Sequence, residues 1–284
     1  MIQNFMKVYM YELEKFLLSK KEDISKISLW SDEANTDRPI KEYLKGLIES
    51  KFFGIPKDSS IENIKVNGEG IIVNNLNHIK INRVLLPEEI TEGVKKLIYT
   101  NKTSVFTNPD ILFEIIDDEK IFYEPVEIKT TKSDSIPGSS VQQIVPDEWV
   151  IFIRFIKSDI EITTGQYIYS INTKLQFPDR SPRPQVSFSE LRNWNYNNRI
   201  SKNNCLVYTL CDEDLLKLEL LKDWQGVLAD RWIEIIFEID NIKTNEPWFN
   251  NNLRKFIVKF LGKYDLLSDD EKRSLKDKLI NLIK

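Results

Sequence analysis

The segment from Asn108 to Lys132, NPDILFEIIDDEKIFYEPVEIKTTK, constrains the fold of this chain more than any other. Apolar residues run or alternate through DILFEI and again through IFYEPVEIKTT, which indicates two β-strands. The polar residues IDDEK between them predict a turn. The segment is therefore predicted to form a β-hairpin whose two arms have unequal lengths.

Three charged side chains of this hairpin are expected to meet. Alternate residues of a strand share a face, so Glu127 and Lys129 point the same way while Ile128 turns into the core. Asp110 opens the first arm, directly after Pro109, and the folded hairpin brings it beside Glu127. Two neighbouring carboxylates repel each other when both are ionised. This arrangement favours a bound divalent cation or a raised pKa.

Carboxylate oxygens are hard ligands that suit Mg²⁺, which keeps several waters and takes substrate phosphate oxygens as further ligands. Such an ion acts as a Lewis acid at phosphorus and lowers the pKa of a bound water. We expect Lys129 to orient that water and to offset charge in the transition state. A role as base would require its pKa to fall far below the ordinary value of about 10.4. The alternative is a surface hairpin with a cross-strand ion pair.

The composition removes several other kinds of chemistry. The chain has one histidine, His78, and two cysteines, so zinc sites built from several such ligands are excluded. A Ser-His-Asp arrangement would depend entirely on His78, which has no nucleophile-elbow glycine motif around it and is expected to be a surface residue. Neither GxxxxGK[ST] nor GxGxxG occurs. Carboxylates, lysine and a hard metal ion remain.

Helices and strands are predicted along the whole chain. Apolar residues at helical spacing predict amphipathic helices over residues 1–20, 38–52 and 87–99. Short strands are expected over residues 60–85, around a turn at NGEG, and two longer ones over DEWVIFIRFI and IEITTGQYIYSI. Beyond about residue 206 helix patterns dominate, including one over DEDLLKLELLKDWQGVLADRWIEIIFEI. The fold class is therefore α/β (α+β), with a central sheet and a helical C-terminal region.

The residues Pro109-Asp110 followed by Glu127-Ile128-Lys129 resemble the signature of the PD-(D/E)XK nuclease superfamily. The following TTKSDSIPGSSVQQ is similar to the segment after that signature in type II restriction endonucleases. Two other acid-x-Lys sequences, at 118–120 and 270–272, lie in a predicted turn and at a helix start. Only 127–129 lies in an apolar strand, and the resemblance covers about residues 105–155.

This resemblance implies a restriction-endonuclease-like core, in which helices flank a mixed β-sheet. It implies one nuclease domain over residues 1–284, with a catalytic core at about 38–175. Residues 176–284 then hold a recognition loop and the C-terminal helices, for which we expect a dimer surface. Carried over by position, Asp110 and Glu127 bind Mg²⁺ with help from the Ile128 carbonyl, and Lys129 places the attacking water.

Many enzymes of this kind add an acidic residue from an earlier helix. The helix over 38–52, for which Asp37 is the expected N-cap, supplies the first candidate, Glu42. The other candidates are Glu49, Glu89 and Glu92. A solvated helix face is the alternative for each of them.

A loop and a helix start are expected after Pro137-Gly138. Small hydroxyls, amides and free backbone N–H groups there suit phosphate oxygens. The residues expected to contact DNA in this region are Lys132, Ser139, Ser140, Gln142 and Gln143. The alternatives are an ordinary N-cap with a polar surface and a solvated lysine.

Arginine and asparagine crowd residues 179–199. Arginine pairs with guanine edges and asparagine with adenine edges in the major groove, so this segment is a candidate recognition element. The candidate DNA-binding residues are Arg180, Arg183, Arg192, Asn193, Asn195 and Arg199. A polar loop leading into the C-terminal helices is the alternative.

The expected function is that of a type II restriction endonuclease. The resemblance implies Mg²⁺-dependent, site-specific hydrolysis of double-stranded DNA that leaves a 5′-phosphate and a 3′-hydroxyl. A homodimer is expected, since a palindromic target matches a two-fold protein. A cognate DNA methyltransferase would be the functional partner in a restriction-modification system. The alternatives are a nuclease of DNA repair or branched-DNA processing, and a non-catalytic DNA-binding protein.

Charge and hydropathy complete these expectations. The net charge is −4, from 40 basic and 44 acidic residues, and a basic cleft can coexist with acidic outer faces. No stretch approaches the ~20 apolar residues of a membrane helix, and the start of the chain does not resemble a secretory signal. Cys205 and Cys211 fit a reducing interior. We therefore expect a cytoplasmic protein without a membrane partner.

Overall fold

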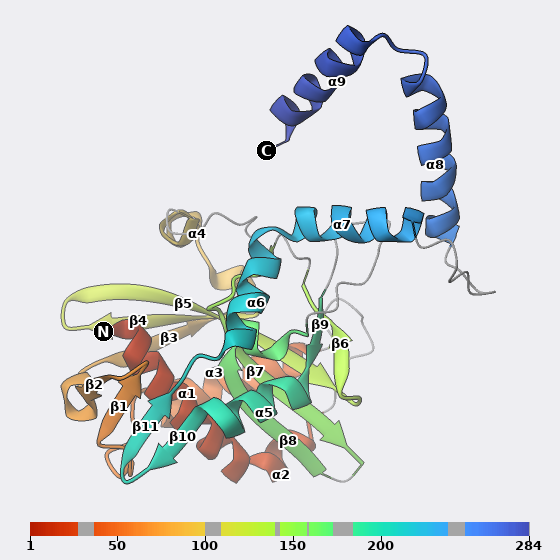
Figure 1. The fold of residues 1–284 in the computed structure, drawn as a ribbon. Helices are drawn as coiled ribbons and strands as arrows, with labels where there is room; N and C mark the ends of the chain where they lie inside the picture. The colour runs from red at the N-terminus through yellow and green to blue at the C-terminus, as the bar shows by residue number, and fades with distance from the viewer. Residues whose placement is uncertain are drawn as a thin grey trace. The chain divides into compact units, whose positions relative to one another are not determined.

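A computed structural model of the protein describes residues 1–27, 37–99, 109–139, 143–157, 159–172, 184–237 and 248–283 (Figure 1). The chain forms two compact units, Met1–Lys222 and Asp223–Lys284. Among the described residues, the first unit holds all the strands. The division lies after Lys222, later than residue 176, where the sequence places the start of the C-terminal region.

A five-stranded mixed sheet organises the first unit, in the order β3-β4-β5-β7-β8. β4 is antiparallel to β3 and β5, β5 and β7 are parallel, and β8 is antiparallel to β7. The protein is therefore a mixed α/β protein, as its sequence predicts. The strands are β3 (Lys80–Leu85), β4 (Ile111–Asp117), β5 (Lys120–Thr131), β7 (Trp149–Ile156) and β8 (Asp159–Gln166).

The predicted hairpin of unequal arms is confirmed as β4 and β5. Their pairing runs from Asp117↔Lys120 at the turn to Ile111↔Val126 at the far end. Asp118 occupies the tight turn with φ 53°, a left-handed conformation that aspartate tolerates better than most residues. Because β5 is longer than β4, residues 127–131 pair with β7 alone. The other edge of this overhang faces the residue that precedes β4, Asp110.

Helices from the start of the chain cover one face of the sheet. α1 (Ile2–Ser19) packs along β8, and the edge of its Tyr9 ring meets Phe113 of β4 with 5.9 Å between ring centroids. α3 (Arg38–Lys51) packs against β3 and adds its apolar side to the same core. The short α2 (Lys21–Ser25) joins α1 at β8. Burial of this apolar face is the main stabilising contribution to the unit.

The opposite face carries Glu127 and Lys129. Lys129 pairs with Phe152 in the β5–β7 ladder, so their side chains share a face. Phe152 meets Phe188 at the start of α5 (Phe188–Asn198), with 5.6 Å between ring centroids. Leu112, on this same face by register, packs with Ile98 of α4 (Glu92–Tyr99). α4 and α5 therefore lie on the face of the sheet to which the charged pair points.

Smaller sheets tie distant segments together. A four-stranded sheet has the order β10-β11-β1-β2, and β1 pairs in parallel with β11. The predicted turn at NGEG joins β1 to β2 through Asn67 and Gly68, which both have positive φ. A two-stranded sheet pairs β6 with β9. These strands are β1 (Asn63–Val66), β2 (Glu69–Ile72), β6 (Ser135–Pro137), β9 (Gln185–Ser187), β10 (Arg199–Lys202) and β11 (Cys205–Tyr208).

Three predicted elements differ in the structure. The helix expected over 87–99 is a 3₁₀ turn at Pro87–Glu89 followed by α4. The Glu89 carboxylate caps the start of this turn by accepting the Leu86 N–H, and Ile90 after it is extended. The strand expected through 171 stops at Gln166, and Tyr167–Ser170 form a 3₁₀ helix. The long helix from 212 divides into α6 (Asp212–Lys222) and α7 (Trp224–Phe237), where Asp223 accepts the Gly226 N–H.

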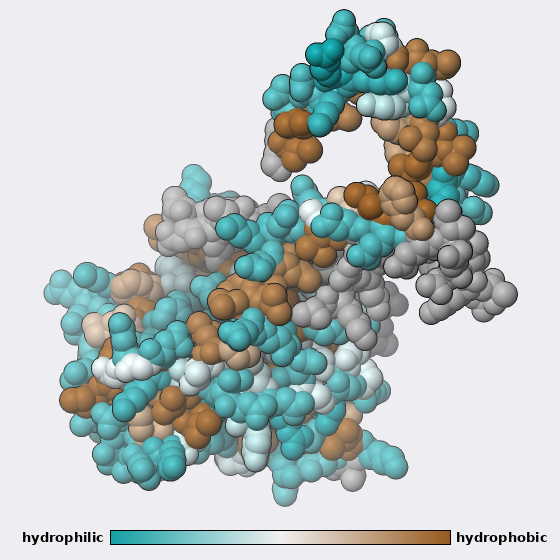
Figure 2. Space-filling model, in the orientation of Figure 1, coloured by the Kyte–Doolittle hydropathy of each residue, from teal (hydrophilic) through white to brown (hydrophobic). Residues whose placement is uncertain are grey.

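The second unit consists of helices in its described part: α7, α8 (Trp248–Tyr264) and α9 (Asp269–Leu282). The Ser268 hydroxyl accepts the Glu271 N–H, and the Glu271 carboxylate accepts the Ser268 N–H, which is a capping box. Hydrophobic residues lie at the surface of α8 and α9 (Figure 2). No helix in the described ranges is long and apolar enough to cross a membrane.

Candidate functional site

The end of β4 and the overhang of β5 bring Asp110, Glu127 and Lys129 together. The Asp110 carboxylate accepts the backbone N–H of Ile128 at 2.8 Å, which holds it beside β5 just beyond the last β4–β5 pair. The Lys129 Nζ lies 2.7 Å from the Glu127 carboxylate. All three charged side chains are largely removed from solvent, with exposed fractions of 20%, 13% and 16%. The structure therefore forms the acid–acid–lysine cluster that the hairpin predicts.

A second lysine, Lys41 of α3, completes the cluster. Its Nζ lies 2.7 Å from Asp110 and 3.1 Å from Asp37, at the start of the same helix. Burial by itself would lower the pKa of Lys41, but the Asp110 and Asp37 carboxylates outweigh burial and raise it. Lys41 is therefore a fixed positive charge against the first acid of the signature.

Glu127 is the residue of the site whose ionised form is disfavoured by its surroundings. Burial raises its pKa most, and the adjacent Asp110 carboxylate raises it further. The Lys129 ammonium acts in the opposite direction but does not cancel these effects, and the pKa of Glu127 is about 7. This group is therefore protonated in part near neutral pH unless another cation approaches.

Lys129 is held as an ammonium. Burial lowers its pKa, but Glu127, Tyr167 and Asp110 together raise it above its ordinary value. Its Nζ also lies 5.9 Å from the centre of the Tyr167 ring, within the range of a cation–π contact. A lysine in this state can orient a water or an anion and offset negative charge, but it is a poor base.

The loop after β5 closes over Tyr167. The Tyr167 hydroxyl accepts the backbone N–H of Ser139 at 2.9 Å, and Gly138 donates its N–H to the Pro184 carbonyl. A Cβ on residue 138 would lie 2.5 Å from that carbonyl oxygen and 2.8 Å from the tyrosine hydroxyl. Glycine is therefore required at position 138 for the loop to approach so closely.

The residues present fit a hard divalent cation. Two carboxylates lie side by side in a poorly solvated place, and the raised pKa of Glu127 shows that a nearby positive charge would be stabilising there. Since the Ile128 N–H points to Asp110, its carbonyl points to the same edge of the strand. Asp110, Glu127 and the Ile128 carbonyl therefore offer an all-oxygen ligand set of the kind that Mg²⁺ prefers.

The acid expected from the helix is not in the cluster. Glu42 is exposed and pairs with Arg38 at 2.7 Å, one turn earlier on α3. Glu49 accepts the N–H of Val84, and Glu89 pairs with Lys45. Glu92 pairs with Lys95. The helix instead presents Lys41 to Asp110, because residue 41 is rotated about 100° from residue 42 around the helix.

The structure describes some of the residues that are expected to contact phosphates. Lys132 is exposed just beyond β5, and Ser139 and Gln143 are half-buried. The backbone N–H of Ser139 is already used by Tyr167, so only its hydroxyl remains for a ligand. Ser140, Gln142, Arg180 and Arg183 lie outside the described residues.

The candidate recognition segment is in part a core helix. Arg192 and Asn193 of α5 are exposed, and Arg192 pairs with Glu161 at 2.7 Å. Asn195 is only 6% exposed and donates to the Thr163 hydroxyl and the Thr164 carbonyl. We revise the expectation for Asn195 accordingly: it holds α5 against β8.

Arg199 is likewise internal. It is 7% exposed, pairs with Glu14 of α1 at 2.7 Å and donates to the Thr164 carbonyl. Its expected role at a DNA surface is therefore corrected, because its guanidinium joins α1, β8 and β10. An arginine that is buried and paired in this way has no free face for a base edge.

Sequence reasoning missed Lys41, Asp37 as its ion-pair partner, and Tyr167. A lysine on a predicted amphipathic helix carries no local signal of a site, and Asp37 was assigned to a cap that its side chain does not form. Tyr167 lies about forty residues after Lys129 and reaches it only through the β5–β7–β8 pairing. Only the folded arrangement, with α3 packed against β3 and the strands in their order, identifies these three.

The fold and the site define the chain as a mixed α/β protein with a half-buried acid–lysine cluster at the end of a strand overhang. Comparison of the sequence with models of protein families finds no match, and comparison with curated proteins finds none either. Any assignment of function to this chain therefore depends on its own residues.

Proposed function

We propose that this protein is a Mg²⁺-dependent deoxyribonuclease of the PD-(D/E)XK superfamily, and specifically a type II restriction endonuclease. One observation carries the proposal: Asp110, Glu127 and Lys129 converge beside the Ile128 amide at the free edge of β5. The mixed sheet with helices on both faces supports a restriction-endonuclease-like core. The substrate would be double-stranded DNA, cut to leave a 5′-phosphate and a 3′-hydroxyl.

Each residue of the cluster has a role in this proposal. Asp110, Glu127 and the Ile128 carbonyl would hold Mg²⁺, which when bound supplies Lewis acidity at phosphorus and lowers the pKa of water. Lys129 remains an ammonium and orients the attacking water against the scissile phosphate. Lys41 contacts the Asp110 oxygen that the Ile128 N–H leaves free, so it adds positive charge to the cluster that would face the phosphate.

The proposal extends to partners and setting. DNA would approach the face of β5 that carries Lys129, and Lys132 and the hydroxyl of Ser139 would contact backbone phosphates. Arg192 and Asn193 on α5 remain candidates for contact with bases. A homodimer would match a palindromic site, and a cognate methyltransferase would protect the host DNA in a cytoplasmic restriction-modification system.

The decisive experiment incubates the purified full chain with mixed-sequence plasmid DNA, with Mg²⁺ and with EDTA. Discrete fragments that form only with Mg²⁺ and share one sequence at their ends would support a site-specific endonuclease. Cleavage confined to branched or damaged DNA would instead indicate a repair nuclease. DNA binding without any cleavage in Mg²⁺ or Mn²⁺ would indicate a non-catalytic DNA-binding protein.

A substitution separates chemistry from binding. Lys129→Ala is expected to reduce the cleavage rate at least 100-fold while the dissociation constant for DNA changes less than about threefold, because the side chain acts on the reacting groups. Lys120→Ala removes an exposed lysine at the far end of the same strand and is the matched control. Unimpaired cleavage by the Lys129→Ala variant would refute the assigned role.

A further inference from the structure

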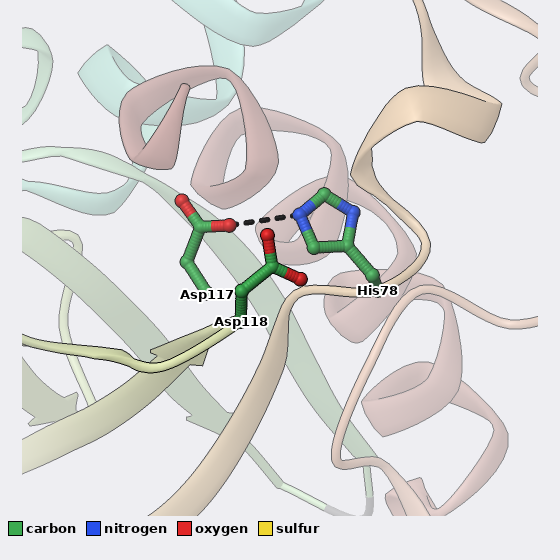
Figure 3. Close-up of side chains that lie close together, drawn as sticks. All are labelled: His78, Asp117 and Asp118. Atoms are coloured by element: carbon green, nitrogen blue, oxygen red, sulfur yellow. Dashed lines mark hydrogen bonds and ion pairs between the residues drawn. The ribbon is translucent and has the colours of Figure 1, made fainter.

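A second cluster of ligand-type side chains lies at the other end of the β4–β5 hairpin. His78 comes from the loop before β3, and Asp117 and Asp118 come from the hairpin turn (Figure 3). The His78 Nε2 lies 2.8 Å from an Asp117 oxygen, and the Asp118 carboxylate lies beside the same imidazole. His78 is the only histidine of the chain, so this is the one place where imidazole and carboxylate donors can meet.

The sheet holds the backbone on both sides of this cluster. Lys80, two residues after His78, pairs with Ile116 in the β3–β4 ladder. Asp117 is itself the last residue of β4 and pairs with Lys120 across the turn. Asp117 therefore lies in the sheet itself, and His78 and Asp118 lie within two residues of hydrogen-bonded strands. Such a scaffold keeps the ligands in place before an ion arrives, which lowers the entropy lost on binding.

The spacing of the donor atoms suits one metal ion. One ligand atom from each of the three side chains lies within 4.8 Å of the other two. Ligands at about 2.1 Å from a tetrahedral ion lie about 3.4 Å apart, so side-chain rotations that move the donor atoms by about an ångström close the set. Three protein ligands leave at least one position for water.

The local charge also favours a cation. Asp117 is largely buried, and within the described part of the chain no lysine or arginine forms an ion pair with Asp117 or Asp118. The only charged partner that Asp117 has there is the imidazole of His78, which carries a positive charge only when protonated. Two carboxylates thus face one weak base, whereas the cluster at Asp110 contains two lysines.

We propose that His78, Asp117 and Asp118 form a binding site for a divalent transition-metal ion, with Zn²⁺ as the most suitable probe. Imidazole nitrogen together with carboxylate oxygen selects ions of this class over Mg²⁺, which favours oxygen alone. A bound ion would replace the His78–Asp117 hydrogen bond and would join the loop before β3 to the hairpin turn. Its water would remain open to solvent, since His78 and Asp118 are exposed.

This site is separate from the one at Asp110. Asp110 precedes the first residue of β4 and Asp117 is the last, so the two sites are about 23 Å apart along the strand. Their ligand sets differ, and neither shares a residue with the other. The metal site can therefore be tested whether or not the protein cleaves DNA.

The single histidine makes the test direct. In the EDTA-treated and dialysed full chain, the imidazole ¹⁵N resonances of His78 are unambiguous and report coordination of Nε2. One equivalent of Zn²⁺ is expected to shift them, and calorimetry is expected to show a site that His78→Gln and Asp117→Asn each weaken at least tenfold. One equivalent of Mg²⁺ should leave the resonances in place.

Two control variants test whether Zn²⁺ binding is specific to these three side chains. Glu119→Gln removes one negative charge from the exposed turn residue next to Asp118. This variant should bind Zn²⁺ with an affinity within twofold of that of the unchanged protein. Asp110→Asn, which alters the other site, should leave the Zn²⁺-induced shift of the His78 resonances unchanged. Imidazole resonances that do not move with Zn²⁺ would overturn the proposal, as would equal Zn²⁺ affinity in the His78→Gln variant. If the imidazole resonances do not move, any Zn²⁺ that the protein binds is held by other groups, such as Cys205 and Cys211.

Discussion

Five charged side chains make up the site at Asp110: Asp37, Lys41, Asp110, Glu127 and Lys129. Three carboxylates oppose two ammonium groups. Burial and, after it, the neighbouring Asp110 carboxylate raise the pKa of Glu127 to about 7. Removal of one negative charge by protonation, or addition of a cation, relieves the same repulsion. The protonation state of Glu127 is therefore linked both to stability and to binding of a divalent ion.

This linkage predicts how stability depends on pH when no divalent ion is present. The pKa of Glu127 is about 7 in the folded protein, against roughly 4.3 in an unfolded chain. Between these values the folded state retains a proton that the unfolded state has released. The contribution of Glu127 is therefore complete below about pH 4.3 and is lost as the pH rises through 7.

Urea denaturation in EDTA checks this expectation. Between pH 4.5 and 7.5 the free energy of unfolding of the Glu127→Gln variant is expected to gain about 1–3 kcal/mol on that of the unchanged protein, because glutamine cannot ionise. Glu119→Gln in the exposed turn should show no such gain. A difference that is constant over this pH range would contradict the raised pKa.

A second prediction concerns Arg199, whose guanidinium is buried against Glu14 and Thr164. Glu14→Ala would leave that guanidinium buried without its carboxylate partner. Loss of one member of a buried pair costs about 3–5 kcal/mol of unfolding free energy. Thermal or urea unfolding measures this loss, and Glu22→Ala on the neighbouring exposed helix is the control. A loss below about 1 kcal/mol would show that Arg199 does not depend on Glu14.

Among the structural elements, the overhang of β5 creates the site. If β4 were as long as β5, a ladder hydrogen bond would take the N–H of Ile128, and Asp110 would lie inside the strand. Because β4 begins at Ile111, the carboxylate of Asp110 takes the place of the missing strand partner. The unequal arms of the hairpin therefore place the first acid beside the second.

The connection from β5 to α5 is held by Asp134. Its carboxylate accepts the hydroxyl of Ser187 at 2.7 Å and the N–H of Ser189 at 3.1 Å, and it pairs with Arg154 at 2.9 Å. It therefore acts as a remote cap for α5. This residue fixes the loop that follows Lys129 to the helix on the same face of the sheet.

Asp134→Ala is accordingly expected to lower the unfolding free energy by about 1–3 kcal/mol, because α5 would lose a cap and Arg154 would lose one of its two carboxylate partners, keeping only Glu161. Lys132→Ala, two residues earlier and exposed, should change it by less than about 0.5 kcal/mol. Urea denaturation compares the two. Equal stability of the two variants would show that the Asp134 contacts contribute little.

The molecule as a whole consists of two units with different character. The first joins distant parts of the chain, since β1 pairs with β11 and α1 packs along β8. The second is a set of helices in which α8 carries an apolar stripe at helical spacing. Its rings at 256, 260 and 264 stack in succession, and the first of them is 61% exposed. An uncovered stripe of this kind suits the dimer proposed above.

Sedimentation of the full chain tests that dimer. Phe256→Glu together with Phe260→Glu is expected to convert a dimer to a monomer, because two charges would be buried in an apolar interface. Val258→Glu, which lies on the other side of α8, is the matched control and should leave the dimer intact. A monomer before any substitution would contradict the proposed dimer, and a dimer that survives both changes would show that the stripe on α8 is not its interface.

Much of the fold follows from local pattern. The hairpin of β4 and β5, the turn at Asn67-Gly68 and helices α1 and α3 all occur where apolar periodicity and turn residues predict them. Alternation along β5 is also sufficient to place Glu127 and Lys129 on one face. These features depend on residues close together in sequence, so their physical causes can be read from the sequence itself.

Tertiary structure determines which residues surround Glu127 and Lys129. Lys41 reaches Asp110 because α3 packs against β3, and Tyr167 reaches Lys129 through two further strands. Asn195 and Arg199 lie in the core because α5 and the start of β10 bring them against β8, although their residue types suggested a surface. Contacts of this kind depend on which elements pack together. Side-chain spacing within one element carries no information about its packing partners, so only the folded chain reveals them.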